Sequence, residues 1–200
     1  IIPGVNTTET DPNKLAPSFE PETADVFEAG FKTQLFENRV RLNIAAFLTT
    51  YKDIQLIANV GVSNFVPVLI NAGDGEIWGI EGEFEAVVTD SLRINGGFGY
   101  QNSKYTRLSP ESIAAGTLLN FRLPNAPEFS ANGGVTWNAI ETESGKLSLR
   151  GDVYYKSSQA KTSNNDPATF QKPYTIANAS MTYTLDDKKT ERKPVFMLDK

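Results

Sequence analysis

Apolar and polar residues alternate with a period of two from Ala24 onward, which is the pattern of strands with one apolar and one polar face. In the first run, for example, Phe27, Phe31 and Leu35 alternate with residues such as Glu28. The pattern predicts strands near residues 24–36, 40–48, 76–87, 92–101, 129–137, 147–155 and 175–185, with an eighth beginning at 195–198. No window has the apolar spacing that a helix needs. The predicted fold class is therefore all-β, with antiparallel strands.

The hairpins between these runs have predictable registers. Only Glu37 and Asn38 separate the first two runs, so paired residues have numbers that sum to 75 and Leu35 lies opposite Val40. This register keeps both apolar faces on one side of the sheet. In the hairpin around residues 89–91, placing residue 86 opposite residue 92 predicts a cross-strand ion pair between Glu85 and Arg93.

The connections alternate between short and long. Short connections lie at residues 37–38 and 89–91, and long ones at 53–75, 106–127 and 159–173. Within the first long connection, residues 54–60 and 64–70 have the pattern of two arms of a hairpin. Several strands reach eleven to thirteen residues, whereas strands of soluble proteins typically have about five or six. Long strands with short turns at one rim and long loops at the other are typical of an outer-membrane β-barrel.

A soluble sandwich alternates too, so the environment of the apolar face has to be decided separately. In a sandwich that face is buried, whereas in a membrane barrel it contacts lipid and the polar face lines a wet lumen. Aromatic residues favour the barrel, because Trp137 and Tyr183 lie near the short-turn rim and Trp78, Tyr100 and Tyr155 near the long-loop rim. The polar face carries charges of both signs, at Glu28, Lys32, Arg41, Glu81, Glu83, Glu85, Arg93, Arg150 and Asp152. We therefore expect the apolar side chains to point outward.

Composition removes several function classes. The 200 residues contain no His and no Cys, which excludes an imidazole base, a disulfide framework and His or Cys metal sites within this chain. No metal site, cofactor or enzymatic activity is predicted. The formal net charge of −5 argues against nucleic acid as a partner. No stretch has the eighteen or so consecutive apolar residues of a membrane-spanning helix.

Four short motifs occur in an order that resembles the TonB-dependent outer-membrane receptors. Each is weak alone, but together they span most of residues 19–185, in the right places among the predicted strands. They are Phe19-Glu20-Pro21-Glu22 followed by Phe27-Glu28-Ala29-Gly30-Phe31-Lys32; Ala46-Phe47 through Tyr51-Lys52-Asp53-Ile54-Gln55; Asn71-Ala72-Gly73 leading to Gly79-Ile80-Glu81-Gly82-Glu83; and Leu123-Pro124-Asn125-Ala126-Pro127 before the strand at 129–137.

The resemblance implies a larger protein than this sequence. Such receptors have a barrel of about 22 strands, filled by an N-terminal plug that carries the TonB box. We expect residues 1–23 to be a connection into the barrel and 24–200 to be about eight strands of a barrel segment without its plug.

The implied function is active transport across the outer membrane of a Gram-negative bacterium. The cargo would be a scarce nutrient such as a ferric siderophore, and the partners would be outer-membrane lipid and, through the missing plug, the TonB–ExbB–ExbD system. The alternative is a small self-contained β-barrel or sandwich that binds a ligand or carbohydrate, which would place Trp78 and Trp137 in its interior.

Candidate substrate contacts follow from the same resemblance, which places the substrate among the long loops and the upper inner wall. Aromatic and cationic side chains there suit an anionic ferric chelate. The candidates are Tyr105, Arg107, Phe121, Arg122, Lys156, Lys161, Phe170 and Tyr174. The alternative is that each of these residues only solvates and packs the loops.

Three carboxylates, Glu81, Glu83 and Glu85, share the polar face of one predicted strand. Carboxylate oxygens suit hard cations. We favour instead a lumenal surface that pairs with Arg93 and with basic residues of the plug.

Overall fold

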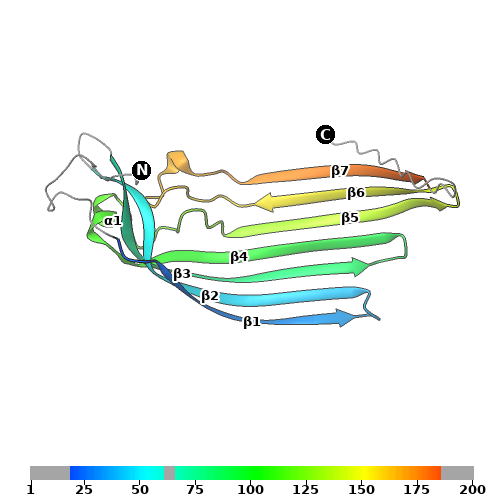
Figure 1. Cartoon of the computed structure of the whole chain (residues 1–200), viewed down its shortest axis with the longest axis horizontal. Helices are drawn as coiled ribbons and strands as arrows, with labels where there is room; N and C mark the ends of the chain where they lie inside the picture. The colour runs from blue at the N-terminus through cyan, green and yellow to red at the C-terminus, as the bar shows by residue number, and fades with distance from the viewer. Residues whose placement is uncertain (1–18, 61–65, 186–200) are drawn as a thin grey trace.

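Seven antiparallel strands form one sheet in sequence order in the computed structural model, which describes residues 19–60 and 66–185 (Figure 1). They are β1 (Thr23–Leu35), β2 (Val40–Val60), β3 (Val66–Val87), β4 (Leu92–Leu108), β5 (Phe129–Thr142), β6 (Gly145–Lys156) and β7 (Tyr174–Leu185). Two short helices, α1 (Pro110–Ala114) and η1 (Pro167–Thr169), lie in long connections. No helix in the described part is long and apolar enough to span a membrane. The all-β prediction and the seven strands are confirmed, and the eighth run, at 195–198, lies outside the described residues.

The first hairpin has the predicted register. Leu35 pairs with Val40 and Phe31 with Ile44, as the sum of 75 requires. Glu37 and Asn38 have positive φ values of 55° and 67°, and Arg39 donates its backbone N–H to the carbonyl of Phe36 at 3.0 Å. Two central residues with positive φ match the right-handed twist of the flanking strands. A two-residue loop therefore fixes the pairing.

The second hairpin corrects one prediction. Ala86 pairs with Ile94, not with residue 92, so Glu85 lies opposite Asn95 and the predicted pair with Arg93 is wrong. The turn is wider than the predicted register would make it, because residue 88 bonds the carbonyl of Leu92 and residues 89–91 form the loop. A shift of two residues preserves the faces but changes the partners.

The long hairpin of β2 and β3 continues past the other strands, as the two predicted arms required. Residues 55–60 pair with residues 66–71 in the described part. The register shifts twice near Ile54, and Asp53 takes a positive φ of 54°. β-Bulges of this kind bend the strands. In Figure 1 the hairpin turns away from the rest of the sheet at this end.

The apolar face of the sheet is exposed. Phe31, Phe84 and Val135 are 53%, 42% and 42% exposed and do not converge on a dry centre. No second sheet covers either face among the described residues, which lie in a single sheet. A sandwich would bury this face, so the arrangement contradicts the sandwich alternative.

The buried hydrophobic core lies at the long-loop end. It comprises Ile54, Tyr105, Leu123 and Ala126, each at most 7% exposed, with partly buried apolar residues around it. These residues come from β2, β4 and the connection between β4 and β5. Burial of apolar surface therefore stabilises the loops more than the sheet.

Within the sheet, aromatic rings cover glycines on neighbouring strands. Phe47 pairs with Gly79, and a Cβ at Gly79 would lie 2.7 Å from the Phe47 ring and 2.4 Å from the carbonyl oxygen of Tyr100. Phe98 covers Gly82, and Phe84 covers Gly96, in the same way. A sheet without a second layer gains its packing from such cross-strand pairs.

Replacing Gly79 therefore tests this packing. We expect Gly79→Ala to destabilise the full-length protein by about 1–3 kcal/mol, because the added methyl group overpacks against a backbone carbonyl and a ring. The measurement is the free energy of unfolding from a denaturant titration. Gly99→Ala is the matched control, since a Cβ there meets only the Ser130 hydroxyl at 3.4 Å. Equal stability of both variants would contradict the packing argument.

Candidate functional site at the long-loop rim

Aromatic side chains mark two levels on the apolar face. At the long-loop side, Trp78 and Tyr100 make an edge-on contact with ring centroids 5.8 Å apart, and Phe129 and Tyr155 lie 6.0 Å apart. At the short-turn side, Trp137 pairs in register with Leu92, next to the turn. From Phe129 to Trp137 the strand rises about 27 Å at ~3.4 Å per residue. With a tilt of about 40° this spans about 21 Å along the membrane normal, close to the apolar band of about 25 Å in an outer-membrane barrel.

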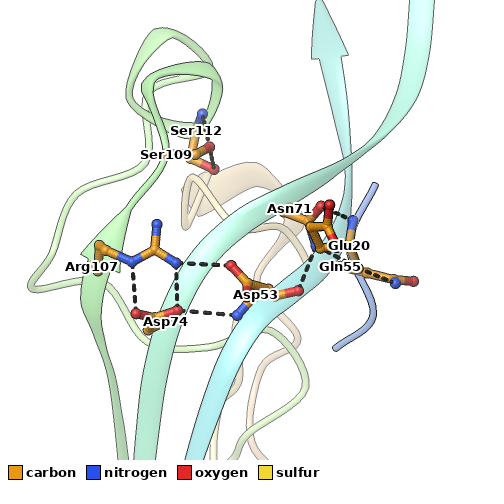
Figure 2. Close-up of polar contacts among 8 residues, drawn as sticks. All are labelled: Glu20, Asp53, Gln55, Asn71, Asp74, Arg107, Ser109 and Ser112. Carbon is orange, nitrogen blue, oxygen red and sulfur yellow. Dashed lines mark hydrogen bonds and ion pairs between the residues drawn. The ribbon is translucent and has the colours of Figure 1, made fainter. Parts of the chain in front are cut away.

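Beyond the long-loop aromatic level, the Arg107 guanidinium bridges two strands. Its Nε and Nη2 donate to the two carboxylate oxygens of Asp74 at 2.7 and 2.8 Å, and Nη2 also donates to Asp53 Oδ1 at 2.9 Å (Figure 2). Asp74 in turn accepts the backbone N–H of Asp53 at 3.1 Å. The bidentate geometry fixes orientation in a way that a single contact does not.

Two further polar side chains extend this network to the entry of β1. Asn71 Nδ2 donates to the carbonyl of Asp53 at 2.8 Å and to that of Glu20 at 2.9 Å, while its Oδ1 accepts the N–H of Glu20 at 2.7 Å. Gln55 donates its backbone N–H to Glu22 Oε2 at 2.8 Å. We call Glu20, Glu22, Asp53, Gln55, Asn71, Asp74 and Arg107 the rim clasp. It joins the chain before β1 to β2, β3 and β4 (Figure 2).

Gly73 lets β3 and β4 approach each other within the rim clasp. Its φ is +134°, and a Cβ there would lie 2.0 Å from the carbonyl oxygen of Arg107. Only glycine fits this combination of backbone angle and close contact. The motif Asn71-Ala72-Gly73 therefore supplies an amide that ties strands together and a glycine that permits the approach.

The two long connections after β4 and β6 are bonded to each other. Asn165 accepts the N–H of Arg122 at 3.0 Å and donates to its carbonyl at 2.9 Å. Asn125 donates its N–H to the carbonyl of Ala160 at 2.9 Å, and its side-chain oxygen accepts from Lys161 Nζ at 3.1 Å. Both asparagines have positive φ, a conformation that asparagine tolerates. We call these two connections the paired loops.

The eight predicted contact residues fall into two groups. Tyr105 is 2% exposed in the core, Phe121 packs against that core, Arg107 belongs to the rim clasp, and Arg122 Nη2 pairs with Glu128 at 2.6 Å. The other four lie on or beside the connection after β6: Lys156, Lys161, Phe170 and Tyr174. Arg122 and Lys161 lie on the two connections that are bonded to each other. Tyr105 lies in the core that these connections cover.

Burial also sets the ionisation of Tyr105. It raises the pKa of this phenol to about 12, because the phenolate form would lose its hydration. The Tyr105 hydroxyl has no hydrogen-bond partner among the described residues. At neutral pH it is therefore a neutral, enclosed group.

Sequence reasoning missed several residues that build the rim. Asp53, Asp74, Asn125 and Asn165 were not among the candidates, although they hold the clasp and the loops together. The signal available was the tendency of Asn and Asp to take positive φ in turns, which three of them show: Asp53, Asn125 and Asn165.

Glu81, Glu83 and Glu85, which we call the acidic ladder, have a different partner from the predicted one. Glu85 Oε2 lies 3.7 Å from Arg41 Nη1. Arg41 belongs to β2, whereas the expected partner Arg93 belongs to β4, on the other side of β3. Among the described residues, no group of three or more acidic side chains could hold a metal ion. The ladder lines the polar face beside small residues such as Ala45 and Gly99, its partners in register.

Comparison with known proteins decides the family. The model for the TonB dependent receptor-like β-barrel matches residues 3–192. The chain belongs to the TonB-dependent receptor β-barrel family. It is a segment of an outer-membrane barrel, so its apolar face contacts lipid and its polar face lines the lumen.

Individual relatives agree with this fold. The metal-pseudopaline receptor CntO of Pseudomonas aeruginosa is 30% identical over 117 residues, which are 58% of this chain and 15% of the relative. The ferric yersiniabactin uptake receptor FyuA from Yersinia pestis aligns with a TM-score of 0.66 at 18% identity, over 92% of this chain and 30% of that one. BauA, the ferric preacinetobactin receptor from Acinetobacter baumannii, aligns with a TM-score of 0.63 at 22% identity, over 90% and 25%. The chain thus spans less than a third of each relative.

A charge on the lipid-facing side should impair assembly of this barrel. We expect Phe84→Arg in the full-length receptor to destabilise the folded barrel by about 2–4 kcal/mol, because the residue lies between the two aromatic levels. The measurement is the folded fraction in outer membranes, read from heat-modifiable migration on gels. Asn43→Arg is the matched control on the lumenal face, and it should fold. Normal assembly of Phe84→Arg would contradict the assignment of the two faces.

The rim clasp should loosen in acid. The hydrogen bond from Arg107 holds the pKa of Asp74 below its ordinary value of 3.8, so its stabilisation is complete above that value and is lost as the pH falls through the lower, folded-state pKa. We expect cleavage of the β2–β3 hairpin by pepsin to increase steeply as the pH falls below about 3.8. In Arg107→Met the hairpin should be cleaved readily at all pH values where pepsin acts, without that step. An identical pH profile for both proteins would contradict the role of the clasp.

Proposed function

We propose that this chain is part of an outer-membrane receptor that takes up a bulky, anionic metal chelate, such as a ferric siderophore, in a TonB-dependent step. The TonB–ExbB–ExbD system would act through the plug. Family membership supports a transport receptor rather than an enzyme. The relatives named above are receptors for metal-pseudopaline, ferric yersiniabactin and ferric preacinetobactin.

The observation that carries the proposal is the single surface that the paired loops form above the lumen. Asn125 and Asn165 lock the loops together, so the side chains on them are held in place before a ligand arrives. Preorganisation of this kind reduces the entropic cost of binding. A preorganised loop surface suits a bulky cargo of fixed shape.

Charge supports an anionic cargo. Residues 156–174 carry three lysines, Lys156, Lys161 and Lys172, against one acid, Asp166, in a chain whose net charge is −5. Asp166 is engaged as the cap of η1, where its carboxylate accepts the N–H of Ala168 at 2.9 Å. The positive charge of this connection is therefore available to a ligand.

The eight candidate residues take two roles in this proposal. Lys156, Lys161, Phe170 and Tyr174 contact the chelate, because they lie on the cationic connection. Tyr105, Arg107, Phe121 and Arg122 support the paired loops, since each is buried in the core, packs against it or is engaged in an ion pair. An organic chelator also fits the composition, because this part of the wall offers no imidazole or thiolate to a bare metal ion.

An uptake assay tests the proposal. Cells grown in low iron would receive radiolabelled ferric siderophore isolated from their own spent medium. Deleting the receptor gene should abolish uptake, and a plasmid with the full-length gene should restore it only when TonB is present. We expect Lys161→Gln to lower uptake about threefold or more, because a charge-assisted contact is lost.

The control is Lys146→Gln, which removes the same charge at the opposite rim, where Lys146 pairs with Glu141 at 3.5 Å. Uptake by the Lys146→Gln receptor should equal that of the unmodified receptor. Transport that persists without TonB, or equal effects of the two lysine variants, would count against the proposal.

A further inference from the structure

Four side chains form a compact block on the lumenal face where β6 and β7 reach the long-loop rim. Tyr154 lies opposite Ile176 in the register, and Lys156 lies opposite Tyr174. The rings of Tyr154 and Tyr174 are 6.2 Å apart between centroids and tilted by 53°. We call these four residues the inner-wall tetrad. Two of them, Tyr154 and Ile176, were not among the candidates from the sequence.

The inner-wall tetrad differs from the wall around it. Two residues further toward the short-turn rim, Asn178 Nδ2 donates to Asp152 Oδ2 at 2.9 Å, so these two polar side chains satisfy each other. In the tetrad, by contrast, Ile176 is 49% exposed on a face that borders water. A single exposed aliphatic residue is ordinary, but here it adjoins two aromatic rings at the entrance to the lumen.

The charge of the tetrad is not neutralised by its neighbours. Lys156 makes no ion pair with any residue in 19–60 or 66–185. Its partners in register are Ser130 and Tyr174, neither of which carries a charge at neutral pH. A lysine in register with one of two adjoining tyrosines, close to an aliphatic side chain, suits a flat, apolar group that carries negative charge at its edge.

We propose that the inner-wall tetrad binds an aromatic ring of the cargo, so that the chelate is one whose metal-binding groups are phenolates or catecholates. This inference rests on the proposed function and narrows its substrate class. The ring of the ligand packs against Tyr154, Tyr174 and Ile176, and its phenolate oxygen lies toward Lys156. A chelate built only from aliphatic hydroxamates or hydroxycarboxylates gains no such contact.

The test uses the purified full-length receptor in detergent and four probes. Two are ferric complexes with aryl groups, a tris-catecholate and a bis-salicylate, and two lack them, a trihydroxamate and citrate. Dissociation constants come from quenching of intrinsic fluorescence. We expect the unmodified receptor to bind at least one aryl complex, and to bind it more tightly than the trihydroxamate and the citrate complex.

The variants separate the ring contact from general damage. Tyr154→Leu and Tyr174→Leu should each weaken binding of the aryl complex by about fivefold, since an aromatic contact contributes roughly that much. Tyr154→Phe keeps the ring and should bind almost normally. Tyr155→Leu is the matched control, because this neighbouring tyrosine lies on the lipid-facing side, and its affinity should not change.

The outcomes distinguish this inference from the proposed function. Preference for an aliphatic complex, or a Tyr154→Leu effect that is absent or equal for all bound probes, overturns the inference and leaves the uptake function standing. An unchanged affinity with a lower unfolding temperature would show that the tetrad only stabilises the fold, which also overturns the inference. Failure to bind any of the four complexes, together with no receptor-dependent uptake, contradicts the proposed function itself.

Discussion

Backbone hydrogen bonding is the constraint on which this structure depends. In hydrocarbon no water is present to bond a free N–H or carbonyl group, so a spanning strand has to be paired along both edges. The meander from β1 to β7 achieves this with neighbours in sequence order, and each pair remains in register across the band between the aromatic levels. Among the described residues the outer edges of β1 and β7 are unpaired, so in hydrocarbon each requires another strand beside it.

A sheet with lipid on one side and water on the other cannot use a buried core. Burial is instead concentrated beyond the band, where Ile54, Tyr105 and Leu123 pack together. There the strands also lose their regular register, since bulges occur near Ile54 and Asp74. The regular sheet and the compact loop region are thus two different solutions to stability in one chain, matched to two different solvents.

The sequence was informative where a local rule decides the structure. Period-two alternation assigned the faces of all seven strands, and the short turn at Glu37 and Asn38 determined a register, because its length leaves one pairing. The turn near residue 90 shows the limit, since two registers that differ by two residues keep the same faces, and only the pairing of β3 with β4 distinguishes them. Parity could not have separated Glu85–Arg93 from the observed pairing.

The candidate site was less accessible to sequence reasoning, because it is assembled from distant segments. Residue type suggested Arg107 and Arg122 as substrate contacts, but it could not show that each has a carboxylate within 3 Å. Likewise, Tyr154 and Ile176 look like ordinary members of two alternating strands. Only the pairing of β6 with β7 places them side by side.

The rim clasp gives a physical reason for the spacing of the family motifs in this chain. Glu20, Asp53 and Asn71 come from three separate motifs and meet within hydrogen-bond distance, while Gly73 removes the side chain that would keep β3 from β4. These are the positions at which strands leave the membrane band and bend into the loops. A bend needs positive φ, an extra residue and partners for the unpaired backbone groups. The motif residues supply all three, so the motifs record how the regular wall is converted into the bent loop region at this rim.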